Sequence, residues 1–198
     1  MLNKLISEFP ALAACRSDIE AAREMIIKTY ERGGKLLLCG NGGSAADCEH
    51  IVGELMKGFK LRREVSDPRI PSELREKMQG ALPAISLCSG ISITTAYAND
   101  VDPTMCFAQL LYGYAKEGDL LIGISTSGNS QNVLNATLVA KALGVATVSL
   151  TGEAESKLSA ASDVTIRVPA KETYRVQEYH LPVYHYLCAA VEQHFFVK

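Results

Sequence analysis

The feature that most constrains this chain is a pattern that occurs twice in its sequence. An apolar run of strand length (residues 35–39 and 119–124) leads into a turn of glycines and small polar residues (residues 40–44 and 125–130), and a helical segment follows each turn. The first backbone N–H groups of a helix have no partner within that helix, so together with nearby hydroxyls they bind anions. The pattern therefore predicts a small ligand that carries a phosphate.

Five apolar runs alternate with helical segments and predict the fold class. The runs are continuous, as expected for parallel strands covered on both faces, and they lie at residues 35–39, 82–88, 119–124, 145–150 and 164–168. This alternation predicts an α/β fold, a doubly wound three-layer αβα sandwich around a five-stranded parallel sheet. Ligands of such sheets bind beyond the carboxyl ends of the strands, so we expect both turns to face one cleft.

Both ends of the chain are expected to be helical. Residues 2–32 predict one long or broken N-terminal helix that ends near Gly33, and we expect this helix to pack against a partner subunit. Residues 173–196 predict a last helix, in which Pro182 should cause a kink or mark the true start.

Residues 60–80 form a polar, charged stretch beside the expected cleft. Ser72 is expected to act there as the N-cap of a short helix. The stretch is either a surface excursion or a lid, and the sequence is equally compatible with both. A length of 198 residues predicts one domain, 1–198, that includes both the N-terminal helical segment and this insertion.

The composition argues against several classes of protein. Lys and Arg number 20 against 22 Asp and Glu, so the chain has no basic field for nucleic acid. No apolar stretch reaches the roughly 18 residues of a membrane helix, and the N-terminus lacks the apolar region of a signal peptide. The 6 cysteines form no C-x-x-C pair and are expected to be reduced core thiols. We therefore expect a cytoplasmic protein with no membrane or nucleic-acid partner.

Imidazole and carboxylate side chains recur at helical spacing. His50 and Glu54 are four residues apart and share a helix face, where they could bind a divalent metal or serve as a base and its orienting partner. Such pairs are more often ordinary surface contacts. Gln177 and His185 lie within about 80° of each other on a helical wheel, but His185 also fits plain packing among the neighbouring tyrosines.

Asn99 and Asp100 follow a helical segment after the second strand. In one interpretation they end that helix, with Asn99 in the left-handed conformation. In the other they are a polar pair that contacts a sugar hydroxyl.

Taken in order along nearly the whole chain, these motifs resemble the sugar isomerase (SIS) domain family and, within it, the phosphoheptose isomerases. The motifs that carry the resemblance are residues 39–44, His50 with Glu54, residues 98–100, residues 123–130, residues 150–152, and residues 175–178 with His185. The turn Ser125-Thr126-Ser127-Gly128-Asn129-Ser130 indicates the SIS fold. The combination of His50, Glu54, Gln177 and His185 narrows the resemblance to the phosphoheptose isomerases.

The resemblance implies a function and a set of site residues. It implies conversion of sedoheptulose 7-phosphate to glycero-manno-heptose 7-phosphate by a homotetramer whose active sites lie between subunits. It implies no nucleotide cofactor and one zinc ion per subunit, bound by His50, Glu54, Gln177 and His185. The implied substrate-binding residues are Asn41, Gly42, Gly43, Ser44, Glu54, Asn99, Asp100, Ser125, Thr126, Ser127, Ser130 and Gln177.

The chemistry of ketose–aldose exchange suits these residues. A proton moves between adjacent carbons through an enediol, which needs an acid, a base and stabilisation of the developing oxyanion. Glu54 and His185 are the predicted catalytic pair. Which of them takes the first proton is left open by the sequence.

Two alternatives remain at this point. The first is an isomerase of another phosphosugar, because the stretch 60–80 looks longer than usual in the family, Tyr174 stands where an acidic residue can occur, and Pro182 interrupts the last helix. The second is a non-catalytic SIS protein, either a sugar-phosphate sensor or an adaptor that resembles the replication-initiator-associating protein. The presence of both Glu54 and His185 favours an enzyme, since an adaptor has no need of an acid/base pair.

Overall fold

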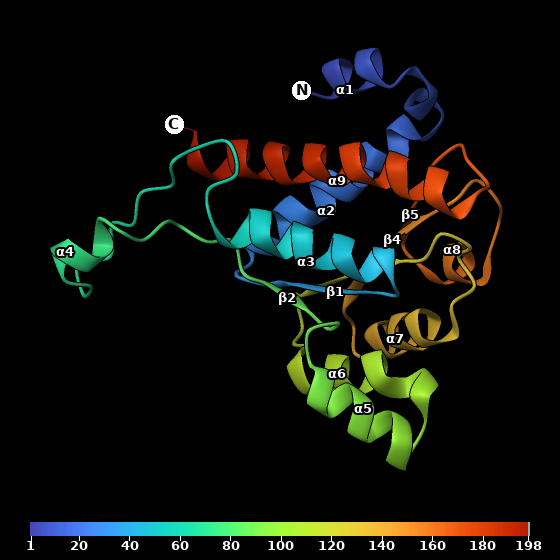
Figure 1. Ribbon diagram of the computed structural model, residues 1–198. Coiled ribbons are helices and arrows are strands. Elements are labelled where there is room, and N and C mark those ends of the chain that lie inside the picture. Colours follow the sequence, from blue (N-terminus) through green and yellow to red (C-terminus); the bar gives the residue numbers. More distant parts are fainter. Residues whose placement is uncertain (198) are drawn as a thin grey trace.

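A computed structural model describes residues 1–197 of the chain. Within these residues, five parallel strands form one sheet in the order β2-β1-β3-β4-β5 (Figure 1). The strands are β1 (Leu36–Gly40), β2 (Ala84–Ser86), β3 (Leu120–Ile124), β4 (Ala146–Thr151) and β5 (Val164–Arg167). The predicted α/β sandwich is confirmed, and only β2 is clearly shorter than its apolar run.

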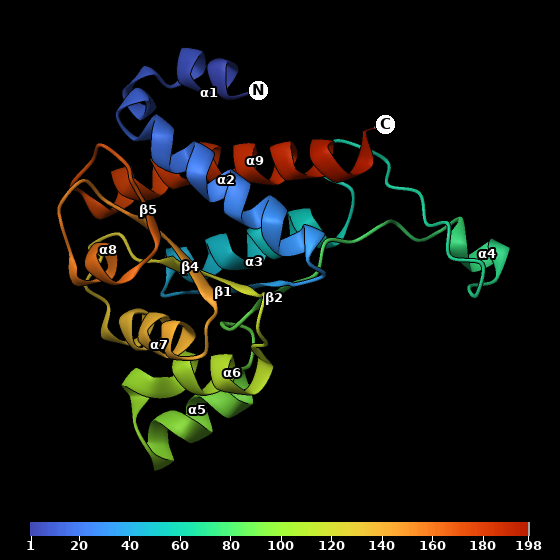
Figure 2. The same cartoon turned by 180° about the vertical axis from the view of Figure 1, so that it is seen from behind.

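Helices cover both faces of the sheet, and the two faces have separate cores (Figures 1 and 2). One face carries α2 (Arg16–Glu31), α3 (Gly43–Met56) and α9 (Thr173–Phe196). The other carries α5 (Ile91–Asp100), η2 (Pro103–Met105), α6 (Cys106–Tyr114), α7 (Gln131–Ala142) and α8 (Lys157–Ala161). Every residue of β1 and β3 is buried, which explains their unbroken apolar sequence.

The register of the central strands aligns the two turns. β1 and β3 are paired from Leu36 with Leu120 through to Gly40 with Ile124, so both strands end at the same level. The turn after each strand therefore starts at the same edge of the sheet, as a doubly wound fold requires of a ligand site.

The N-terminal helical segment is broken. It comprises α1 (Leu2–Glu8), the 3-10 helix η1 (Pro10–Cys15) and α2, and α1 lies across α9 (Figures 1 and 2). The break coincides with Pro10, which cannot donate a helical hydrogen bond. α2 ends as predicted at Gly33, whose φ of 76° is readily adopted by glycine, and the Gly34 N–H then donates to Thr29 O at 2.9 Å.

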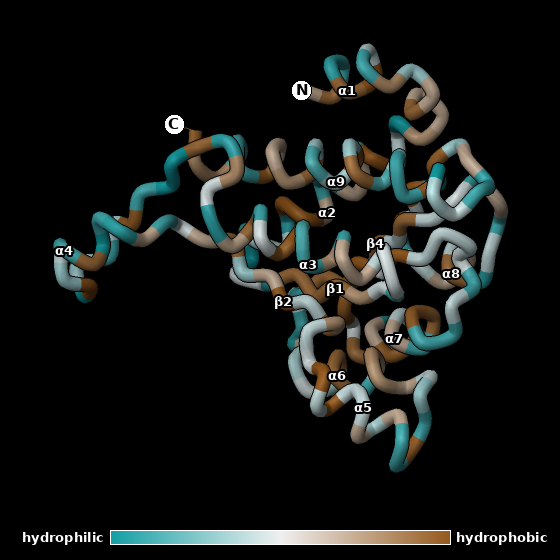
Figure 3. Tube along the Cα trace, viewed as in Figure 1, coloured by the Kyte–Doolittle hydropathy of each residue, from teal (hydrophilic) through white to brown (hydrophobic). Residues whose placement is uncertain are grey.

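Much of the stretch 60–80 projects from the body as an arm that carries α4 (Ser72–Arg75), and Figure 3 shows that most of its residues are hydrophilic. The predicted N-cap is wrong by one residue, because Pro71 holds that position and Ser72 is already helical. The base of the arm is anchored by Arg63, which is buried and donates from Nε to Glu192 Oε1 at 2.8 Å.

Two further expectations about helix ends are corrected. α9 runs continuously through Pro182, so this residue neither starts nor interrupts the helix. Asn99 lies inside α5, and no non-glycine residue in the described chain has a positive φ, so the left-handed cap is wrong. Among residues 1–197, no helix combines the length and the apolar character that crossing a bilayer requires.

Candidate active site

The turn after β3 carries hydroxyl side chains around Gly128, a position that only glycine can occupy. Gly128 has a φ of 65°, and a Cβ there would lie 2.1 Å from Ser156 Oγ. Ser125 is buried and its Oγ lies 3.0 Å from Ser130 Oγ, whereas Ser127 is exposed. No lysine lies in residues 125–130, so an anion here would be bound by hydroxyls and backbone dipoles rather than by an ammonium group.

The turn after β1 lies beside the turn after β3. The side-chain amides of Asn41 and Asn132 form a reciprocal pair, with both N–H···O distances at 2.9 Å. Asn132 is the second residue of α7, so the pair joins the turn after β1 to the helix that follows the turn after β3. In the turn after β1, Gly42 and Gly43 are exposed, whereas Ser44 is buried.

A cluster of ionisable side chains forms where α3 and α9 lie next to each other. His50 Nε2 is 3.3 Å from Glu54 Oε1 and 3.4 Å from His185 Nε2. The Glu54 side chain is only 14% exposed, and its second oxygen lies 3.3 Å from Lys57 Nζ. The structure thus brings together His50, Glu54 and His185, although 131 residues separate Glu54 from His185 in sequence.

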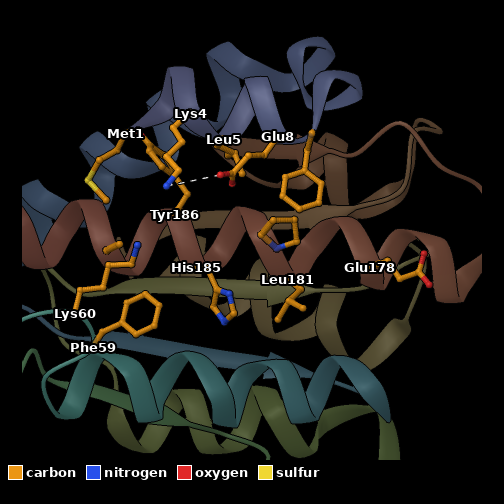
Figure 4. Close-up of a pocket in the computed structure, with 13 residues that line it drawn as sticks. Met1, Lys4, Leu5, Glu8, Phe59, Lys60, Glu178, Leu181, His185 and Tyr186 are labelled. Atoms are coloured by element: carbon orange, nitrogen blue, oxygen red, sulfur yellow. Dashed lines mark ion pairs between the residues drawn. The ribbon is translucent and has the colours of Figure 1, made fainter.

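His185 also borders a groove between α1 and α9 with a volume of about 430 Å³. Figure 4 shows the His185 ring projecting from α9 toward α3, with Phe59 and Lys60 on one side and Leu181 on the other. Burial lowers the pKa of His185, and the charges of His50 and Lys60 add to that effect while Glu54 opposes it. A depressed pKa keeps the imidazole neutral near pH 7 and able to accept a proton.

Gln177 lies at the other end of α3. Its Nε2 would be 2.5 Å from a Cβ on Gly43, so the absence of a side chain at Gly43 makes room for this amide. Seven helical residues, ~10 Å of helix, separate Gly43 from His50. The structure therefore places Gln177 beside the turn after β1. No hydrogen bond in residues 1–197 links Gln177 to His50, Glu54 or His185.

Asn99 and Asp100 lie on α5, on the opposite face of the sheet from α3 and α9 (Figure 1). Both are exposed, and Asn99 Nδ2 donates to Asp100 Oδ1 at 2.8 Å. A single subunit does not bring this pair to the cluster of His50, Glu54 and His185.

The fit of the cluster to a metal ion is partial. A tetrahedral zinc site with bonds of about 2.0–2.1 Å puts neighbouring ligand atoms about 3.3–3.4 Å apart. Both separations around His50 Nε2 match this value, and two imidazoles with a carboxylate are donors that zinc accepts. Within residues 1–197, however, no group of three or more His, Cys, Asp and Glu side chains is already arranged to hold a metal.

The sequence patterns did not identify three residues of the site, Asp47, Asn132 and Tyr184. Asp47 could have been found, since it lies three residues before His50 and extends the face shared with Glu54. Asn132 and Tyr184 carried no usable signal, because an asparagine in the first turn of a helix is common and a tyrosine on an apolar helix face reads as core.

Comparisons with known proteins identify the family and the fold. The sequence profile of the SIS domain matches residues 4–152. The chain is 40% identical over 204 residues to the phosphoheptose isomerase of Helicobacter pylori, and the alignment covers 98% of each chain. Solved phosphoheptose isomerases from Neisseria gonorrhoeae and Francisella tularensis superpose with TM-scores of 0.77 and 0.78 at 31% and 28% identity. These superpositions cover 96% and 97% of this chain, and 93% and 98% of the solved chains.

Proposed function

The chain belongs to the SIS domain family and within it to the phosphoheptose isomerases, and from this premise we propose that it interconverts D-sedoheptulose 7-phosphate and D-glycero-D-manno-heptose 7-phosphate. The observation that carries the proposal is the contact of both Glu54 and His185 with His50. An aldose–ketose isomerase needs an acid and a base held close together.

The phosphate would be bound at the carboxyl edge of the sheet. Hydroxyls of Ser125, Thr126, Ser127 and Ser130 and the free N–H groups at the start of α7 can donate to its oxygens. Asn41, Gly42, Gly43 and Ser44 border the same edge, and Gln177 lies against Gly43. These residues are our proposed substrate contacts within one subunit.

The acid/base chemistry would be carried out by Glu54 and His185. A base removes a proton from C1 of the ketose while an acid protonates the C2 carbonyl oxygen, which gives the enediol. Return of a proton to C2 and loss of the O1 proton then give the aldose. The Glu54 carboxylate and the neutral His185 imidazole are both able to accept a proton, and each can return it from the same atom.

A zinc ion would be held by His50, Glu54 and His185, with Gln177 as the fourth residue of the set. When bound, zinc would act as a Lewis acid that polarises the substrate oxygens. The matching separations around His50 support this set. The position of Gln177 beside Gly43 means that its side chain must turn toward His50 to join.

The positions of the proposed residues support an oligomer. Glu54 lies ten helical residues, ~15 Å, beyond Ser44, and Asn99 and Asp100 lie on the opposite face of the sheet. Residues separated in this way act on one small substrate only if neighbouring subunits complete each site. We therefore propose an oligomer of single-domain subunits with active sites between subunits. The family resemblance sets our proposed number of subunits at four, and we propose a cytoplasmic location from the composition.

The test is to incubate the purified protein with sedoheptulose 7-phosphate and follow the product by ¹³C NMR, before and after treatment with a chelator. We expect the aldose phosphate to form, activity to fall on chelation, and zinc to restore it. Fructose 6-phosphate and ribulose 5-phosphate serve as comparison substrates. Faster turnover of either would assign the chain to another phosphosugar, and no turnover of any would favour a non-catalytic SIS protein. Light scattering tests the tetramer.

A further inference from the structure

Tyr184 lies directly behind His50, between α3 and α9. It is 2% exposed, and its hydroxyl oxygen is 3.1 Å from Asp47 Oδ1 and 3.0 Å from His50 Nδ1. Its ring meets the His50 ring edge-on, with centroids 5.4 Å apart, and the His185 ring in the same way at 5.1 Å. One buried phenol therefore contacts both imidazoles of the cluster.

The protons available to these three side chains determine the direction of each hydrogen bond. An ionised carboxylate only accepts, so the single Tyr184 proton must be donated to Asp47 Oδ1. The contact between the Tyr184 oxygen and His50 Nδ1 is then a hydrogen bond only if Nδ1 carries a proton and donates it.

The reverse arrangement would remove the hydrogen-bond partner of Asp47, a partly buried carboxylate. If His50 carried its proton on Nε2, Tyr184 would have to donate to Nδ1 and would no longer donate to Asp47. Asp47 Oδ2 is already buried without a hydrogen-bond partner in the described part of the chain. Both oxygens of a partly buried carboxylate would then be unpaired, which is strongly unfavourable. Glu54 Oε1, 3.3 Å from His50 Nε2, would gain a donor in that form, but Glu54 is already paired with Lys57 at 3.3 Å in either tautomer, whereas Asp47 has only Tyr184.

We propose that Tyr184 is a positioning residue whose hydroxyl, held by Asp47, fixes His50 as the Nδ1–H tautomer and leaves its bare Nε2 as the acceptor that faces His185 Nε2. His50 Nε2 then accepts a hydrogen bond from His185 Nε2–H, or donates its lone pair to a cation. Imidazole ligands of metals are commonly oriented in this way through their second nitrogen. The link to catalysis rests on the function proposed above, whereas the tautomer does not.

The tautomer can be read directly in the metal-free protein. Long-range ¹H–¹⁵N correlation spectra of ¹⁵N-histidine-labelled protein at alkaline pH distinguish the two neutral forms, and with 4 histidines in the chain a His50→Gln variant assigns the signal. We expect the Nδ1–H form of His50 in the wild-type chain. Observation of the Nε2–H form would overturn the proposal, and this measurement requires no other variant to fold.

Two variants separate the hydrogen-bond chain from simple packing. In Asp47→Ala, Tyr184 loses its acceptor and should donate to His50 Nδ1, so His50 should change to the Nε2–H form. Tyr184→Phe keeps the aromatic ring but removes the hydroxyl, so His50 should no longer be restricted to the Nδ1–H form. Tyr30→Phe is the matched control, because it deletes another buried phenol, one that donates to Pro83 O at 3.2 Å. A His50 tautomer that stays unchanged in Asp47→Ala contradicts the proposal.

A second measurement tests the consequence for the site. Loss of an outer partner of a metal ligand commonly lowers metal affinity or activity about 10- to 100-fold. Titration of zinc against a chelating dye should therefore show weaker binding in Tyr184→Phe and no change in Tyr30→Phe, with kcat reduced and KM retained. Unchanged zinc affinity and kcat would overturn this part. The tautomer is measured without substrate or metal, so it stands if the proposed function fails, whereas the zinc measurement rests on the zinc site of that function.

Discussion

The hydroxyl turn after β3 and the cluster of His50, Glu54 and His185 are built in opposite ways. The turn consists of six consecutive residues, 125–130, whose main internal contacts span five residues or fewer. The cluster joins two helices: the contact of His50 with His185 spans 135 residues of sequence, and the contact of His50 with Tyr184 behind it spans 134. The turn therefore depends on local conformation, whereas the cluster depends on how α3 packs against α9.

This difference explains how each region should respond to mutation. A change in the turn removes one donor to an anion and leaves its neighbours in place. A change in the cluster, or in any contact that sets the position of α3 against α9, alters several functional atoms together. Four sets of variants test that contrast.

The largest effect is expected from the acid/base pair. Glu54→Gln and His185→Gln should each lower kcat by about 10²–10⁴, because each removes a group that exchanges a proton with the substrate. KM should change little, and steady-state kinetics with circular dichroism separate this loss from unfolding. His194→Gln is the matched control, since His194 is on the same helix but pairs with Glu31 at 3.1 Å. Substantial activity in both variants would refute the assignment.

Arg63 should have the largest effect on stability. Its Nη2 donates to Glu54 O at 3.0 Å and its Nη1 to Leu55 O at 2.6 Å, so it satisfies the last carbonyls of α3 while Glu192 pairs with its charge. Arg63→Met leaves buried Glu192 without its cation, bonded only to the N–H groups of Phe59 and Lys60, and should lower the free energy of unfolding by about 3–5 kcal/mol. Urea denaturation measures this loss.

The exposed arm supplies the control for this prediction. Arg69 pairs with Asp67 but is 87% exposed, so Arg69→Met should leave stability within about 1 kcal/mol of the wild type. Equal losses in the two arginine variants would show that the base of the arm does not hold α3 in place.

Stability should also depend on pH through His180, which links α9 to the end of β4. His180 is fully buried and bonds to Thr151 O at 3.3 Å, and burial lowers its pKa from 6.5 to about 4. Between these values the unfolded chain binds a proton that the folded chain does not, so stability is highest above pH 6.5 and falls as the pH drops toward 4. The loss should reach roughly 3 kcal/mol. Urea titrations at several pH values should show that the free energy of unfolding depends less steeply on pH in His180→Gln than in His194→Gln.

The smallest effect is expected in the turn. Ser127 is exposed, and its hydroxyl is free to donate to a charged phosphate, which is worth about 1.5–3 kcal/mol. Ser127→Ala should raise KM about 10- to 100-fold with little change in kcat or melting temperature. Ser17→Ala, an exposed serine on α2, is the control. An unchanged KM would argue against phosphate binding here.

Most of the fold was predictable because its signals are local. Continuous apolar runs identified β1, β3, β4 and β5 to within a residue or two, and Gly33 correctly predicted the end of α2. The errors concern residues whose local preference was overridden. Pro182 lies within α9 because Val183, Tyr184 and Leu187 around it are buried, and that packing stabilises the helix against the loss of one N–H.

The site was predictable in part for the same reason. The hydroxyls of the turn are consecutive in sequence, so their grouping needed no tertiary information. The meeting of His50 with His185 was suggested by family resemblance rather than by spacing. The contact of Gln177 with Gly43 and the hydrogen bonds of Tyr184 depend on the register between two helices that are far apart in the chain.

The sequence by itself determined the parallel sheet, the two turns at its carboxyl edge and the chemistry of the side chains available there, because hydrophobic runs, glycines and hydroxyls act over a few residues. Only the tertiary structure decided which imidazole faces Glu54, which atoms of His50 are hydrogen-bonded, and that Asn99 and Asp100 lie on the other face. The physical reason is that side-chain contacts between helices follow from the packing of a whole core, to which residues throughout the chain contribute.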